Sequence, residues 1–123
     1  MEKSNLNITI FSFMLIALFF SCTKYEKVLR IKDLLNPQRH DVTINCDPTG
    51  IILDIQGELN GSATLEVLSE TDPNERYMFR LEEGLVDTSM RGDWYSKEIY
   101  LQYAPQGASE GYLTIKVNIC GLF

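Results

Sequence analysis

The amino-acid sequence predicts an all-β protein, an antiparallel β-sandwich or small barrel, preceded by an N-terminal signal peptide and a short tether. Two observations predict the β domain. From residue 41 onward, apolar residues recur at every second position in several short runs. Residues that favour turns separate these runs. A third observation, an apolar N-terminal stretch, predicts the signal peptide. We therefore expect a signal peptide over 1–21, a tether over 22–40 and a sandwich domain over 41–123.

The N-terminal stretch has the layout of a signal peptide. Lys3 and the free amino group give a weakly positive start, and an apolar run from Ile8 to Phe20 follows. This run is too short to cross a bilayer, which needs about 20 apolar residues. The sequence therefore predicts export followed by cleavage or anchoring.

The end of this leader carries the residues Leu18-Phe19-Phe20-Ser21-Cys22. This pattern resembles the lipobox that ends the type II signal peptide of bacterial lipoproteins, with Ser21 as the small residue. The ending is similar to that of small uncharacterised lipoproteins of Bacteroidota. The resemblance implies that Cys22 becomes the N-terminus and carries a thioether-linked diacylglycerol, usually with an N-acyl chain such as palmitate. More than one acyl chain gives stable membrane anchoring.

The stretch from 23 to 40 fits two local structures. Tyr25, Val28, Ile31 and Leu35 have helical spacing, and Asn36-Pro37 would end such a helix. Leu29, Ile31 and Leu35 also fit a strand that pairs with the domain. We expect a lipidated tether that runs into a short helix or into the first strand.

The sandwich domain is predicted from six alternating runs. Their inward residues are Val42, Ile44 and Cys46; Ile51, Leu53 and Ile55; Ala63, Leu65 and Val67; Tyr77, Phe79 and Leu81; Ile99, Leu101 and Tyr103; and Leu113, Ile115, Val117 and Ile119. Turns are predicted at Asp47-Pro48-Thr49-Gly50 and at Asp72-Pro73-Asn74. Asn60-Gly61 is a hairpin signal.

Two cysteines remain once Cys22 is assigned to the lipid. Cys46 and Cys120 form an even pair in an exported chain, which allows a disulfide between them. Cys46 is in phase with inward residues, whereas Cys120 is out of phase with its own strand. A bulge or a strand end would realign the two. The alternative is a pair of separate thiols.

No arrangement of residues predicts catalysis or metal binding. His40 is the only histidine, and we expect it in a solvated loop. Two distant cysteines and one histidine do not have zinc-site spacing. The carboxylates near Asp72 and Glu82 are explained by turns. We expect no catalytic residue, no metal and no cofactor.

A group of aromatic residues is the strongest candidate for ligand binding. Trp94, Tyr95, Tyr100 and Tyr112 lie within a short span, and Tyr100 and Tyr112 are in the outward phase of their strands. Exposed aromatic rings with polar tips stack on sugars or anchor protein partners. The alternative is that these residues serve strand formation and cross-strand packing.

The formal net charge of −6 disfavours nucleic acid as a partner, because phosphate binding needs a basic surface. The expected partners are the lipid bilayer, through the lipid on Cys22, and an envelope protein or a glycan. The sequence thus predicts a non-enzymatic binding module anchored in the cell envelope, at the outer membrane. Two alternatives are a structural accessory subunit of an envelope complex and a small hydrolase whose site the sequence does not mark.

Overall fold

Eight β-strands make up most of the chain that the computed structural model describes, residues 25–120. Cys22 and the predicted leader lie outside these residues. Within residues 25–120, no helix is long and apolar enough to cross a membrane. The strands are β1 (Tyr25–Ile31), β2 (Gln38–Thr43), β3 (Gly50–Leu59), β4 (Ser62–Ser69), β5 (Arg76–Leu81), β6 (Gly84–Asp93), β7 (Glu98–Gln106) and β8 (Gly111–Ile119).

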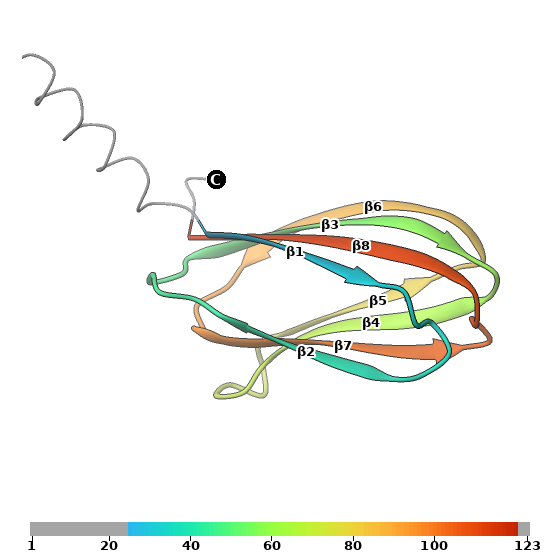
Figure 1. Ribbon diagram of the computed structural model, residues 1–123. Helices are drawn as coiled ribbons and strands as arrows, with labels where there is room; N and C mark the ends of the chain where they lie inside the picture. Colours follow the sequence, from blue (N-terminus) through green and yellow to red (C-terminus); the bar gives the residue numbers. More distant parts are fainter. Residues whose placement is uncertain (1–24, 121–123) are drawn as a thin grey trace, which may run out of the picture.

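The strands form two four-stranded sheets that face each other (Figure 1), with orders β1-β8-β3-β6 and β2-β7-β4-β5. All the strand pairs are antiparallel. Four of the pairs correspond to one long hairpin whose tip is the β4–β5 turn: β1·β8, β2·β7, β3·β6 and β4·β5. Rolling this hairpin adds the pairs β3·β8 and β4·β7. The result is an eight-stranded jelly roll, and the predicted all-β sandwich is confirmed.

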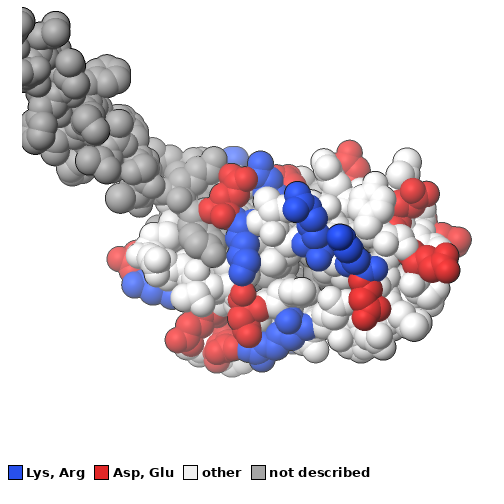
Figure 2. Space-filling model, in the orientation of Figure 1, with Lys and Arg blue, Asp and Glu red and all other residues white. Residues whose placement is uncertain are grey.

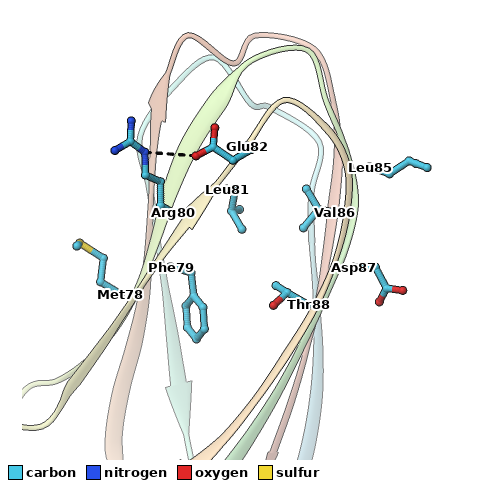
Figure 3. A pocket seen from close by; sticks show the side chains of 9 residues that line it. All are labelled: Met78, Phe79, Arg80, Leu81, Glu82, Leu85, Val86, Asp87 and Thr88. Atoms are coloured by element: carbon cyan, nitrogen blue, oxygen red, sulfur yellow. Dashed lines mark ion pairs between the residues drawn. The ribbon is translucent and has the colours of Figure 1, made fainter.

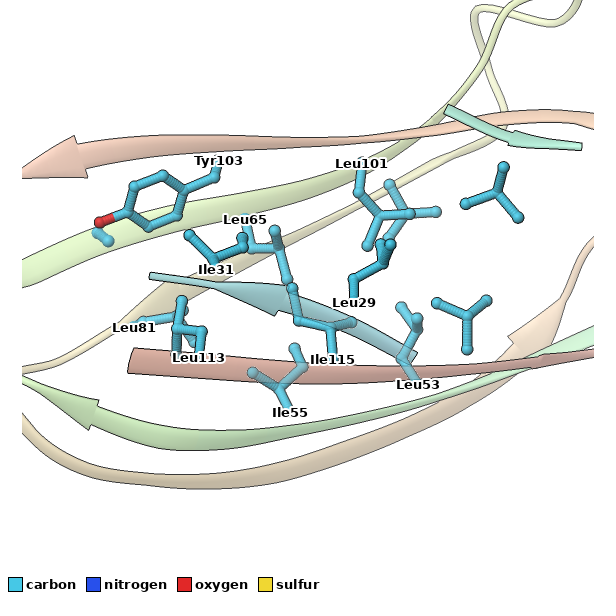
Figure 4. Close-up of a cluster of buried hydrophobic side chains, with 14 of the residues drawn as sticks. Leu29, Ile31, Leu53, Ile55, Leu65, Leu81, Leu101, Tyr103, Leu113 and Ile115 are labelled. Carbon is cyan, nitrogen blue, oxygen red and sulfur yellow. The ribbon is translucent and has the colours of Figure 1, made fainter. Parts of the chain in front are cut away.

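The core lies between the sheets, where the predicted period-two residues meet. Leu53, Ile55, Leu65, Leu101, Tyr103, Leu113 and Ile115 are all buried there (Figure 4). The Tyr103 hydroxyl donates a hydrogen bond of 2.7 Å to the carbonyl of buried Leu34. Alternation alone places these side chains inside, because successive side chains of a strand point to opposite faces.

Residues 25–40 belong to the sandwich and include its first strand, which was one of the two expected alternatives, so the domain begins before the expected residue 41. β1 pairs with β8 along its whole length, and Leu29 and Ile31 are buried in the core. The helical interpretation fails because Val28 and Leu35 are exposed. β2 contains His40, which is half-buried on a strand rather than in a solvated loop.

The hairpin predicted at Asn60-Gly61 is a crossing between sheets, because β3 and β4 belong to different sheets. The Asn60 side-chain oxygen accepts the backbone N–H groups of Ser109 (2.8 Å) and Glu110 (3.0 Å). A Cβ at Gly61 would lie 2.5 Å from the backbone of Gly107, so only glycine allows this approach. Contacts with the β7–β8 loop therefore select the crossing.

The sandwich has two ends. The N-terminal end contains the start of β1, the end of β8, and the loops 44–49, 70–75 and 94–97. At the far end lie the loops 32–37, 60–61, 82–83 and 107–110. These two names are kept below.

Candidate functional site

The four aromatic residues predicted as one ligand platform lie apart in the structure. Trp94 is 0% exposed and offers no stacking surface. Tyr100 is on β7 and Tyr112 on β8, so they lie on the outer faces of opposite sheets. Tyr95 is 65% exposed at the N-terminal end. The prediction of a single platform is wrong, because strands β7 and β8 are adjacent in sequence but belong to different sheets.

A neighbouring side chain on the same face of the sheet lies over the Tyr100 ring. The Arg39 guanidinium lies 4.0 Å from the centre of the Tyr100 ring. Arg39 also bonds Asp41 at 2.9 Å and forms an ion pair with Glu70. A cation over an aromatic face is stabilising. The Tyr100 ring therefore takes part in a surface cluster instead of standing open to a ligand.

Trp94 acts as the anchor of the loop that presents Tyr95. Its indole Nε1 donates a hydrogen bond of 2.9 Å to the carbonyl of Ser96, and its backbone N–H donates to the carbonyl of Thr49 at 3.4 Å. Its ring lies 6.1 Å from the Tyr77 ring. A buried tryptophan with its polar tip satisfied holds a loop firmly.

A second set of contacts ties this loop to the β4–β5 turn. The Glu75 carboxylate accepts hydrogen bonds from the Tyr95 backbone N–H and from the Ser96 hydroxyl, the latter at 2.9 Å. The Ser96 hydroxyl also lies 2.6 Å from that of Ser69. Ser69 and Ser96 are both buried. Buried polar groups that satisfy one another rigidify the segments they join, so the two loops form one unit.

These two loops border a cleft of about 360 Å³, which we call the Tyr95 cleft. Its lining residues are Asp72, Asn74, Glu75, Arg76, Tyr77, Asp93 and Tyr95. The Tyr77 hydroxyl donates a hydrogen bond of 3.0 Å to the Asp93 carbonyl, which fixes that ring against the cleft. Aromatic rings beside carboxylates and an amide suit a ligand with both apolar faces and hydroxyl groups.

The sequence indicated only parts of this cleft. Asp72 and Asn74 were expected in a turn, and the Asp72 carboxylate does accept the Asn74 N–H at 3.0 Å. Tyr77 was expected inside the core; it is half-buried and lines the cleft. Nothing in the sequence joined the turn at 72–74 to Tyr95, because the contact depends on the pairing of whole strands.

The two cysteines of the described chain form a disulfide, Cys46–Cys120, with a Cα–Cα distance of 6.0 Å. Cys120 follows the end of β8 and has a φ of 64°. This left-handed backbone breaks the alternation of β8, so a residue that is out of phase with its strand still reaches Cys46. The bridge links the β2–β3 loop to the C-terminal end of β8.

Charged side chains of both signs are interspersed on the face shown in Figure 2. Lys116 pairs with Glu26 at 3.3 Å, and Lys97 pairs with Asp47 at 2.9 Å. No group of three or more potential metal ligands occurs within residues 25–120. The Tyr95 cleft combines two tyrosine side chains with carboxylate and amide groups.

No protein-family model matches the chain, and no curated protein sequence matches it. Among solved structures, a chain from the disulfide-linked pili of Bacillus endospore appendages is similar, with a TM-score of 0.51 and 8% identity over 80% of this chain and 88% of that one. The Tobacco streak virus coat protein aligns with a TM-score of 0.43 and 11% identity over 80% and 86% of the two chains. A CBM4 structure aligns with a TM-score of 0.42 and 5% identity over 73% and 66%. The first of these likenesses supports the sandwich fold and nothing beyond the fold.

Proposed function

We propose that this chain is a lipid-anchored protein of the bacterial cell envelope whose jelly-roll domain binds a glycan, without enzymatic activity, in the Tyr95 cleft. One observation carries the proposal. Tyr95 is exposed, yet the loop on which it lies is held by the buried Trp94 and by Glu75. A ring presented on a rigid loop loses little conformational entropy when it binds, so it contributes more affinity than a mobile one.

The cleft offers the chemistry that sugar rings need. The flat faces of Tyr95 and Tyr77 provide apolar contact, and Asp72, Asn74 and Asp93 provide hydrogen-bond groups for hydroxyls. Glu75 already accepts hydrogen bonds from Tyr95 and Ser96, so we assign it to holding the loop and not to binding the ligand.

The start of β1 supports attachment at the N-terminal end. Only Thr23 and Lys24 separate Cys22 from Tyr25, the first residue of β1. A fully extended chain advances about 3.3–3.6 Å per residue, so the lipid on Cys22 would hold the domain within about 10 Å. The Tyr95 cleft lies at this same end, close to the membrane. That position favours a glycan of the envelope itself, and we place the protein at the outer membrane.

The ligand proposal is tested on a glycan array and by titration calorimetry with the array hits. Tyr95→Ala should abolish binding, because it removes the exposed ring, and Tyr95→Phe should retain most of it. Tyr112→Ala is the matched control, since Tyr112 is 52% exposed on β8, near the far end of the sandwich. An intact chain that binds no glycan, or equal losses from Tyr95→Ala and Tyr112→Ala, contradicts the proposal.

The anchor is tested separately by metabolic labelling with a palmitate analogue in a bacterial host. We expect label in the native chain and none in the Cys22→Ala variant. Cys46→Ala provides the control for loss of a cysteine, since Cys46 is bound to Cys120. Label that persists in Cys22→Ala rules out this cysteine as the lipid site.

A further inference from the structure

The sandwich has two long sides, one between the edge strands β1 and β2 and one between the edge strands β5 and β6. Different contacts join the two sheets on each side. On the β1/β2 side, Lys27 is in phase with the inward residues Leu29 and Ile31. Its Nζ donates a hydrogen bond of 3.4 Å to the carbonyl of Asp41 on β2. An inward lysine on an edge strand disfavours pairing with a further strand. This side is therefore protected.

The β5/β6 side carries a pocket between the two edge strands (Figure 3). Near the N-terminal end, the Tyr77 hydroxyl joins β5 to β6 through the Asp93 carbonyl. Toward the far end lies a cavity of about 410 Å³ whose walls include Phe79, Leu81 and Val86. Met78 and Leu85 at its rim are 64% and 83% exposed.

β6 is the longest of the four edge strands. It is 10 residues long and pairs with β3 from Gly84 to Asp93 without interruption by a bulge. It contains neither proline nor lysine, and its inward residues (Val86, Thr88, Met90 and Gly92) carry no charge. A regular edge strand of this kind presents unpaired backbone N–H and C=O groups to a further strand.

We propose that β6 pairs edge to edge with β6 of a second copy of this chain, forming a symmetric dimer. In an antiparallel pair, side chains that face each other lie on the same face of the sheet. The register with Ser89 opposite Ser89 places Asp87 of each copy opposite Arg91 of the other. Both ion pairs form at once, because the axis through Ser89 is twofold.

Neighbouring registers lack this charge complementarity. A shift by two residues in one direction places Asp87 opposite Ser89, and a shift in the other direction places Asp87 opposite Asp93. Like charges directly opposite are destabilising. On the inner face, the favoured register places Val86 opposite Gly92 and Thr88 opposite Met90, with no charge among them.

The dimer proposal does not depend on the proposed anchor. A twofold axis perpendicular to the shared sheet points the N-terminal ends of the two copies in opposite directions along the strands.

The interface is tested with the full chain in detergent, carrying Cys22→Ser in every variant so that an added cysteine has no native thiol to compete with. Ser89→Cys should form a disulfide-linked dimer under mild oxidation, because the two side chains would lie about 4.5–5.5 Å apart at Cβ. Gln102→Cys is the control, since Gln102 is exposed on the central strand β7 of the other sheet. Equal cross-linking by the two variants, or none by Ser89→Cys, overturns the proposal.

Charge reversal provides the second measurement, by sedimentation between about 1 µM and 1 mM. Asp87→Arg or Arg91→Asp alone should weaken the dimer about tenfold, because each creates like-charged pairs. The double variant should restore the dimer. If the single variants weaken the dimer and the double variant does not restore it, the proposed register is wrong. If the chain is a monomer at every concentration, the dimer proposal is wrong. The β6 edge would then be available to an extended segment of another protein.

Discussion

Replacing Trp94 with alanine should destabilise the fold, although the sequence pointed to Trp94 as a ligand contact. The side chain is 0% exposed, and burying a tryptophan removes about 150–250 Å² from water. At about 25 cal/mol per Å², this burial corresponds to about 4–6 kcal/mol. Truncation of a buried tryptophan typically costs about 3–5 kcal/mol, and the Ser96 carbonyl also loses its donor. We expect a loss of about 4 kcal/mol in the free energy of unfolding.

This loss is measured by urea denaturation followed by circular dichroism, with the disulfide intact. Circular dichroism is needed because Trp94 is the only tryptophan, so the variant has no indole fluorescence. Tyr95→Ala is the matched control. Tyr95 is exposed, and its truncation should change stability by less than about 0.5 kcal/mol. A loss below about 1 kcal/mol for Trp94→Ala, or an equal loss for Tyr95→Ala, refutes the assignment of Trp94 as an anchor.

Three further predictions concern stability. Replacing Cys46 and Cys120 together with alanine should lower the free energy of unfolding by about 4 kcal/mol, since the bridge spans a sequence separation of 74; an unchanged denaturation midpoint contradicts this. Asn60→Ala should cost about 1–3 kcal/mol in the same assay, because two backbone donors lose their acceptor, whereas Asn60→Asp should cost less. Burial raises the pKa of Tyr103 in the folded state. The unfolded state therefore loses this proton first, and stability should fall as the pH rises above about 10. Tyr103→Phe should remove this part of the pH dependence, and an unaltered pH profile would count against it.

The sequence predicted the strands well where alternation is regular. Leu53, Ile55, Leu113 and Ile115 are all buried, as their spacing requires. For Tyr25–Ile31 the sequence left a helix and a strand open, because helical and alternating patterns overlap there, and only pairing with β8 selects the strand. Propensity over so short a segment is weaker than the tertiary contacts available to it.

The candidate site could be predicted only in fragments. Tyr95 is exposed, as its predicted role in binding requires, but Trp94 beside it is buried. The loop 94–97 has no periodicity, so nothing local distinguishes inward from outward positions. The cleft arises because Glu75, from a distant turn, bonds the same loop.

The sequence by itself determined which residues of the regular central strands face inward, because period-two alternation follows from the geometry of a single strand. It also determined the turns at 47–50 and 72–74, which depend on neighbouring residues alone. Tertiary structure decided which strands share a sheet. Asn60-Gly61 is compatible with a hairpin or a crossing, and contacts with Ser109 and Glu110 select the crossing. That choice places β7 and β8 in different sheets, so Tyr100 and Tyr112 lie on opposite faces and Tyr95 joins the β4–β5 turn instead.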